Sequence, residues 1–496
     1  MKKLVISKLF LYRYRFVIGY VILGISFIFL LLAMSLYVQW GLSDAEMDSA
    51  VSACGLSFDS PMDGDLVDLP YRLLQKITIR LFGLTPFAIK LPSVLVGFVL
   101  GFLLILLLNR WFKNNVSLLA SCLVVLSTPF LFLAGSGTPL IMLVFWPTLL
   151  LWLGSKIQGE KRPRPMYSLL FALALLLAVF TPYMLYFALF CLGFVILQPH
   201  LRFVVKSLPK IPLILVGLVV LGGLAALVIN IVNHPDTIME LLFARGFEMD
   251  SFLTNIRSGL TPVFMWSGTP ESIFLAPLIS MPILALALIG LLSTTKGFFA
   301  SRNSIATLLI IFTLVITGFN PEAVIAFILP FAILIAHGIK YLLEKWYGLF
   351  PENPYARIAA LIPLSFLFGM IIIPGLLQYV NGYRYNPNIA SQFNYDLAII
   401  RGELSNETLL AREHYDFYSL LENSSELTVL NELPNDSVGV DSIAVLHGTM
   451  DDNRYQLKRI IASPLRENSD IIYLYTVKEK NDGSDYGPNE VVEPAS

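Results

Sequence analysis

Long apolar runs, separated by short polar segments, dominate the chain from its first residues to about position 380. A bilayer core about 30 Å thick needs roughly 20 apolar residues of helix to cross it. We therefore predict eleven transmembrane helices, at residues 16–38, 91–109, 116–134, 139–154, 166–181, 183–198, 211–233, 273–294, 304–318, 321–339 and 358–380. The fifth and sixth share one apolar stretch, broken at Thr181-Pro182-Tyr183, where proline permits a tight turn. One long helix is the alternative there.

Lysine and arginine are distributed unevenly between alternate loops. Nineteen lie in the N-terminal segment and the loops that share its side, and six lie in the opposing loops: Arg72, Lys76, Arg80, Lys90, Arg245 and Arg257. Because basic loops stay in the cytoplasm, we predict a multi-pass protein of the plasma (inner) membrane with a cytoplasmic N-terminus. If the fifth and sixth spans were a single helix, the basic loops would no longer alternate with the opposing loops. The distribution therefore favours eleven spans. No small-residue cleavage site follows the first run, which predicts a retained helix.

The polar segments predict three regions. Residues 1–380 form the membrane domain, with two long outside loops at 39–90 and 234–272. Residues 381–478 are expected to form a small outside α/β domain, and the acidic tail 479–496 to be disordered. Within the α/β domain, helical periodicity marks 390–404 and 413–422, and β-rich runs mark 427–433, 442–447, 455–462 and 470–477.

The composition excludes several classes of function. The 496 residues are 56% hydrophobic and 14% charged, against about 25% charged for soluble domains, which excludes a cytosolic globular protein. The formal net charge of -1 indicates no nucleic-acid partner. The three cysteines and five histidines lack metal-ligand spacing, so we expect no cofactor and no metal site of that kind, while a need for a divalent ion stays open. No phosphate-binding loop supports an ATP-driven pump.

Three acids follow the first apolar run. Ser43 and Glu46 have the spacing of a capping box, in which Glu46 accepts the Ser43 amide at the start of a helix. Glu46 is thus either a cap or, like Asp48, a substrate-binding residue. Asp44 stands within a turn of the membrane surface, where a carboxylate can act as general base on an acceptor hydroxyl. We predict that Asp44 is the catalytic residue.

A basic helix is expected at about 66–84. Arg72, Lys76 and Arg80 recur every four residues beside a leucine- and isoleucine-rich face, a pattern typical of an amphipathic helix in the membrane interface. These cations either pair with ordinary lipid phosphates or hold a phosphate-linked donor. In the second long loop, Arg245 or Arg257 is a further candidate for the donor phosphate. Trp266 there belongs either to the interfacial aromatic belt or to a sugar-stacking surface.

The first long loop carries a resemblance to a known family. The chain resembles the N-terminal signature of glycosyltransferase family 39, which includes protein O-mannosyltransferases and lipid A aminoarabinose transferases, over roughly residues 10–155. The similarity rests on Asp44-Ala45-Glu46, on Asp68-Leu69-Pro70-Tyr71, and above all on Leu81-Phe82-Gly83-Leu84-Thr85-Pro86-Phe87-Ala88-Ile89-Lys90-Leu91-Pro92-Ser93.

The resemblance implies a GT-C fold, that is, an all-α polytopic membrane enzyme, here with a small C-terminal α/β domain. It implies transfer of a sugar from a polyprenyl-phosphate donor to an extracytoplasmic acceptor, with membrane lipids as further partners. By position Asp44 matches the family's catalytic aspartate, and Lys90 matches the basic residue of its Arg-Leu-Pro-Ser element. We therefore expect Lys90, or another basic residue of the first loop, to bind the donor and counter charge on the departing polyprenyl phosphate.

The chain departs from the family pattern at three places. Ala45 replaces the usual second acid, the segment 134–139 lacks the family's Arg and acid, and no cation stands near 320–322. A membrane glycosyltransferase is therefore our leading hypothesis. Its rival is a non-catalytic transporter, flippase or degenerate scaffold of the same architecture.

Overall fold

The chain forms two compact units, residues 1–394 and 395–496. The computed structural model describes residues 10–56, 66–159, 165–197, 202–203, 210–243, 251–264, 274–275, 277–295, 301–349, 355, 359, 361–404, 407–422, 427–433, 442–446, 448–450, 452–462 and 471–478.

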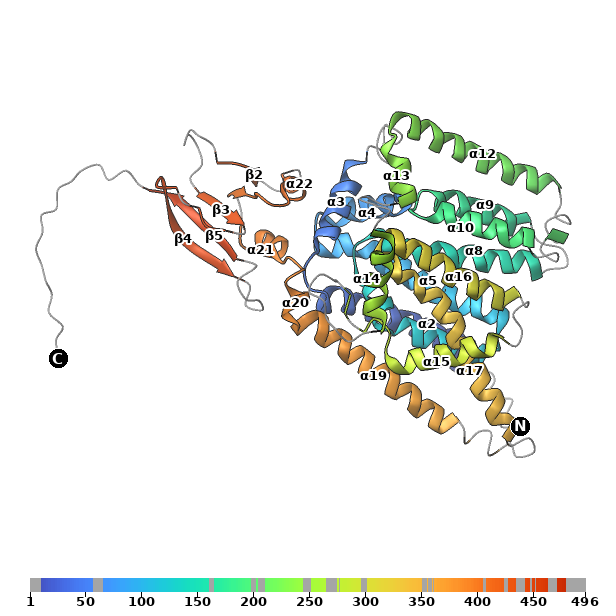
Figure 1. Ribbon diagram of the computed structural model, residues 1–496. Coiled ribbons are helices and arrows are strands. Elements are labelled where there is room, and N and C mark those ends of the chain that lie inside the picture. Colours follow the sequence, from blue (N-terminus) through green and yellow to red (C-terminus); the bar gives the residue numbers. More distant parts are fainter. Residues whose placement is uncertain are drawn as a thin grey trace, which may run out of the picture. The chain divides into compact units, whose positions relative to one another are not determined.

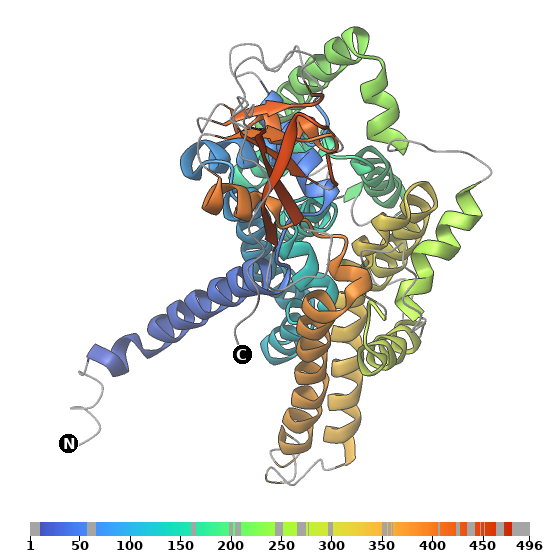
Figure 2. The same ribbon diagram turned by 90° about the vertical axis from the view of Figure 1, so that its left-hand side faces the viewer.

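The described secondary structure of the first unit is helical, apart from one isolated β-bridge. Figure 1 shows α8, α9, α10 and α12 lying side by side, and Figure 2 shows the same helices after a quarter turn. The helices before α9 are α2 (Phe10–Ala33, continued by a π-helix at Met34–Val38), α3 (Asp44–Gly55), α4 (Leu69–Phe82), α5 (Pro86–Trp111), α6 (Asn114–Val125), α7 (Thr128–Gly135) and α8 (Met142–Gly159). Those that follow are α9 (Pro165–Val179), α10 (Met184–Leu197), α12 (Lys210–Asn233), α13 (Asp236–Phe243), α14 (Phe252–Phe264), α15 (Met281–Thr294), α16 (Ser301–Phe319), α17 (Ile328–Leu349), α19 (Leu361–Tyr385) and α20 (Pro387–Ala390).

A described helix overlaps each of the eleven predicted spans. Six helices are long and apolar enough to cross a membrane, and α6 with α7, bent by 64° at their junction, make a seventh if they form one broken span. Four shorter apolar helices fall in α9, α10, α12 and α15. The polytopic helical fold class is confirmed, whereas the count of eleven spans stays a prediction.

The proline break between the fifth and sixth predicted spans is real. Helix α9 ends at Val179 and α10 begins at Met184. Between them Tyr183 adopts φ 66°, in the left-handed region that non-glycine residues rarely enter. Its amide donates to the carbonyl of Leu241 at 2.9 Å. These are therefore two helices, and α13 holds the turn between them.

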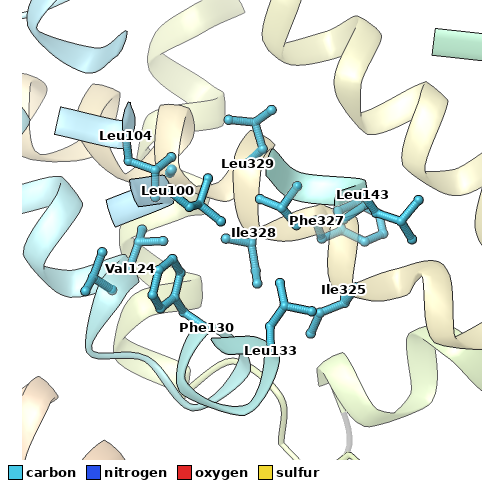
Figure 3. Close-up of a cluster of buried hydrophobic side chains, with 14 of the residues drawn as sticks. Leu100, Leu104, Val124, Phe130, Leu133, Leu143, Ile325, Phe327, Ile328 and Leu329 are labelled. Carbon is cyan, nitrogen blue, oxygen red and sulfur yellow. The ribbon is translucent and has the colours of Figure 1, made fainter. Parts of the chain in front are cut away.

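The core of the first unit packs around a 3-10 helix, η5 (Pro321–Phe327), which leads into α17. Figure 3 shows Ile325 and Ile328 facing Leu133 of α7, with Leu100 of α5 and Phe130 of α7 close to Ile328. All five side chains are buried. This packing fixes the ends of α5, α7 and α17 relative to one another, and the candidate site is built on the start of α5 and the end of α7.

Helix α19 extends beyond the apolar run that predicted it, and the first compact unit ends at residue 394. Polar packing explains the extension. The Arg384 guanidinium lies 3.8 Å from the ring centroid of Tyr37 and 5.4 Å from that of Trp40, and it donates to the Tyr37 carbonyl at 3.3 Å. The end of α19 is therefore held against the end of the first span, where hydrophobicity gives no signal.

The second unit is a five-stranded sheet with the order β2-β1-β3-β5-β4. The strands are β1 (Thr408–Leu410), β2 (Thr428–Leu430), β3 (Ser442–Leu446), β4 (Tyr455–Ala462) and β5 (Ile471–Val477). Strand β1 runs parallel to β2 and β3, and β5 pairs antiparallel with β3 and β4. Two helices, α21 (Asp396–Glu403) and α22 (Tyr415–Ser419), lie within the predicted helical segments. The tail 479–496 lies outside the described residues.

Candidate active site in the first loop

A glycine turn places the start of α3. Gly41 has φ 101°, and a Cβ built there would lie 2.7 Å from the carbonyl oxygen of Asn394. Leu42 forms an antiparallel bridge to Asn394, with N–H···O distances of 2.8 and 2.6 Å. Any L side chain at position 41 is strained in this conformation. The chain leaving the first span is thus tied to the segment after α19 just before the acidic motif.

The Glu46 carboxylate joins two distant segments. It accepts the Ser43 amide at 2.8 Å, which forms the predicted capping box, and the Gly137 amide at 2.5 Å. Glu46 is fully buried. A Cβ at Gly137 would lie 2.9 Å from Ile89 Cγ2 and 3.0 Å from the Ile89 carbonyl oxygen. Glycine therefore allows the loop between α7 and α8 to approach both α5 and the acid.

Lys90 is the counter-charge of Glu46. Its Nζ lies 3.7 Å from Glu46 Oε1, and the two side chains are 1% and 0% exposed. The ammonium also donates to the Gln39 carbonyl at 2.6 Å and lies 5.8 Å from the ring centroid of Phe393. Charges taken out of water persist only when they are paired and hydrogen-bonded. The basic residue of the Lys90-Leu91-Pro92-Ser93 motif is therefore engaged inside the protein.

Gln75 extends this network to α4. Its Nε2 donates to the carbonyls of Ile89 and Gly137, at 3.2 and 3.1 Å, and its Oε1 accepts the Ser49 hydroxyl at 2.8 Å. Gln75 is fully buried. One amide side chain thus links α3, α4, the start of α5 and the loop 136–138. Buried networks of this kind are costly to break because each lost partner leaves a desolvated polar atom.

A second link joins α4 to α5. The Tyr71 and Ser93 hydroxyls lie 2.7 Å apart, and the Ser93 hydroxyl is 3.3 Å from the Thr138 carbonyl. Burial raises the pKa of the Tyr71 phenol well above its ordinary value, so it stays neutral. Tyr71 is 0% exposed. It is therefore a positioning element rather than a proton donor to substrate.

Asp44 and Asp48 occupy the other face of α3. Both are exposed, whereas Glu46 between them is buried. Asp44 is the first residue of the helix, where backbone N–H groups and the positive helix end favour a carboxylate. The structure therefore separates the three acids: Glu46 holds the framework, and Asp44 and Asp48 present carboxylates outside it.

The basic residues of α4 also differ from one another. Lys76 donates to the carbonyls of Cys54 and Leu56, which ties α4 to the end of α3. Arg72 is half-buried and Arg80 is exposed. The predicted amphipathic helix is present, with apolar side chains such as Leu74 and Leu81 exposed beside the cations. Such a face suits a membrane interface.

The second long loop contributes less to the described site. Arg257 is exposed on α14. Arg245 and Trp266 lie outside the described residues. Asp44 lines neither of two cavities formed by described residues, one between α8, α10 and α16 and the other beside α6, α15 and α19. Among described residues, no three His, Cys, Asp or Glu side chains converge as metal ligands do.

The buried polar network around Gln75 was not predicted from the sequence. Gln75, Ser49 and Gly137 were not among the candidate residues. One signal was available: Tyr71, Gln75 and Thr78 recur at helical spacing on α4, opposite its leucines. A helix with a polar stripe that is buried against other helices needs partners for each group.

Residues 70–224 match the family model described as dolichyl-phosphate-mannose-protein mannosyltransferase. The structure of ArnT from Cupriavidus metallidurans in the apo state superposes with a TM-score of 0.54 at 12% identity, covering 93% of this chain and 98% of that one. ArnT bound to undecaprenyl phosphate gives 0.53 at 10% identity, with the same coverage.

A more distant likeness is to the Archaeoglobus fulgidus oligosaccharyltransferase in complex with Zn and sulfate. Its TM-score is 0.50 at 11% identity, over 85% of this chain and 67% of that one. A search of curated protein sequences finds no match.

The family match and the likeness to ArnT together indicate the class of this protein. The chain is a multi-pass membrane protein with the GT-C glycosyltransferase fold, similar to glycosyltransferase family 39. Within that class it shares the fold of ArnT over nearly the whole length of both chains.

Proposed function

We propose that the protein is a membrane glycosyltransferase that takes a sugar from a polyprenyl-phosphate donor and transfers it to an extracytoplasmic acceptor. The observation that carries this proposal is the family match over residues 70–224. The match begins in α4, the helix that follows the acidic helix α3. The ArnT fold supports it, since one of the two ArnT structures holds undecaprenyl phosphate.

The reaction needs few groups. The bond between the anomeric carbon and the phosphate oxygen breaks, and polyprenyl phosphate leaves with the electron pair. The acceptor oxygen forms the new bond to the anomeric carbon and loses its proton to Asp44. Because phosphate is already a good leaving group, positioning, a base and a cation beside the phosphate suffice. Asp44 is exposed at the start of a helix that Glu46 and Lys90 fix in place.

The cations of the first loop differ in how well they can contact the phosphate of the donor. Arg72 and Arg80 flank the apolar face of α4, which suits contact with a lipid phosphate at the interface. Lys90 is 1% exposed and paired with Glu46, so contact between its ammonium and a phosphate would require that pair to open. We therefore assign the phosphate first to α4, with Arg257 as a further contributor, and give Lys90 a positioning role.

Donor binding tests the proposal without requiring an acceptor. Purified protein in phosphatidylcholine vesicles should bind a fluorescent polyprenyl phosphate, and a polyprenyl-phospho-sugar should displace it. A nucleotide sugar should not. Folded protein that does not bind the fluorescent lipid, or from which the polyprenyl-phospho-sugar does not displace it, would contradict the proposal. Passage of the lipid across the vesicle without sugar release would instead favour a flippase.

We also expect the loops on the two sides to differ in accessibility. Residues 39–90 and everything after about 380 should face outside, and 155–165 and 199–210 should face the cytoplasm, because of the basic asymmetry. With Cys54, Cys122 and Cys191 replaced by serine, single cysteines near positions 160 and 440 should react with an impermeant maleimide from opposite sides. Labelling of both from one side would refute the eleven-span topology.

A further inference from the structure

An apolar cavity of about 170 Å³ lies between α8, α10 and α16, close to the end of α5. Its wall is built from aromatic and aliphatic side chains, among them Phe171, Phe190, Phe194 and Phe312. An engineered apolar cavity of about 150 Å³ is large enough to bind benzene. This space therefore accepts several methylene groups of a hydrocarbon chain.

We call the end of the cavity at Ser155 and Gln158, near the end of α8, its mouth; two arginines lie close to residues that line the cavity. Ser155 and Gln158 line it, and no acidic side chain is among its described lining residues. Arg110 donates to the Ser155 carbonyl at 3.2 Å, and Arg302 donates to the Trp111 carbonyl at 3.2 Å. Two guanidinium groups thus stand one hydrogen bond away from residues that line the cavity.

This cavity is remote from the first-loop site. Helix α5 carries Lys90 near its start and ends at Trp111, which lines the cavity. At 1.5 Å of rise per residue, the two positions are about 30 Å apart, close to the thickness of a bilayer core. A phosphate at the mouth of this cavity is therefore a different group from one beside Asp44.

We propose that this cavity holds an acyl chain of an anionic glycerophospholipid, whose phosphate lies beside Arg110 and Arg302. An apolar chamber with a cationic mouth complements a molecule with a hydrocarbon tail and a negative head. The lipid would come from the leaflet on the basic side of the bundle. This site is separate from the proposed transfer reaction and does not depend on it.

Photolabelling tests whether an acyl chain occupies the cavity. Protein in phosphatidylcholine vesicles, containing a small fraction of phosphatidylglycerol with a diazirine at the end of one acyl chain, should be labelled on peptides of α8, α10 and α16. Gly154 lines the cavity, and a Cβ there meets nothing nearer than Phe171 at 3.9 Å. Gly154→Leu should therefore fill the cavity and abolish this labelling. Gly193→Leu, on α10 where a Cβ meets no atom within 4 Å, is the matched control and should leave it unchanged.

Head-group selectivity tests whether the arginines at the mouth favour an anionic head group. A phosphatidylcholine probe with the same chain should label these peptides about fivefold less, and Arg110→Gln should lower phosphatidylglycerol labelling by a similar factor. Lys345→Gln, an exposed cation on α17, should have no effect. Equal labelling by both probes, or labelling that Gly154→Leu leaves intact, would overturn the proposal. Competition by polyprenyl phosphate but not by unlabelled phosphatidylglycerol would assign the cavity to the donor instead and overturn it as well.

Discussion

Asp44→Asn should lower turnover by about 100- to 10,000-fold while donor binding is retained, because general-base assistance typically contributes that factor. Asparagine is nearly isosteric with aspartate but cannot take the acceptor's proton. The capping box of Ser43 and Glu46 is unchanged by this substitution, so α3 should keep its fold. Turnover and donor affinity, measured on the same membrane-inserted preparation, provide the check.

The chain offers a matched control for this change. Asp48 lies one turn further along α3 and is exposed like Asp44. Asp48→Asn removes the same charge from the same face, so a purely electrostatic effect on the acceptor would appear in both variants. We expect Asp48→Asn to retain most of the turnover. Wild-type turnover in Asp44→Asn with loss in Asp48→Asn would move the base to Asp48.

Lys90→Met should destabilise the membrane unit by about 3–5 kcal/mol, the usual cost of leaving one member of a buried ion pair without its partner. Glu46 would keep the amides of Ser43 and Gly137 but would lose the ammonium 3.7 Å away. The free energy of unfolding in detergent, from a reversible denaturant titration, measures the loss. Arg80→Met, which removes an exposed cation from α4, should change stability by less than about 0.5 kcal/mol.

A double variant separates the two roles considered for Lys90. Glu46→Gln with Lys90→Met removes both charges, so it should be more stable than Lys90→Met alone, although one amide contact of Glu46 is lost. If Lys90 only positions the loop, turnover should recover together with stability. Recovered stability with turnover still absent would show that Lys90 contacts the substrate directly.

The sequence predicted the helical framework well because membrane burial imposes long apolar runs. Helix α4 could also be predicted, since its cations and leucines recur at helical spacing. The break at Thr181-Pro182-Tyr183 could be predicted as well, because proline permits a tight turn there. Strand β1 was missed. Its three residues are too few to show alternation, and its place between β2 and β3 depends on pairing rather than on composition.

The candidate site was only partly predictable, because its decisive contacts join distant segments. The capping box of Ser43 and Glu46 is local and was foreseen. The bond from the Gly137 amide to Glu46 spans 91 residues, and the pairing of Glu46 with Lys90 depends on how α3 packs against α5. Motif position placed Lys90 beside a substrate phosphate, whereas packing places its ammonium inside the protein. Asp44 remains a prediction from motif and exposure together.

The central claim is that this protein moves a sugar from a lipid phosphate. The most direct test is the release of polyprenyl phosphate from a polyprenyl-phospho-sugar, by purified protein in vesicles supplied with a mixture of acceptors. The account predicts release that requires an acceptor and that falls by about 100-fold or more in Asp44→Asn. Folded, donor-binding wild-type protein that releases no polyprenyl phosphate with any acceptor pool would contradict it.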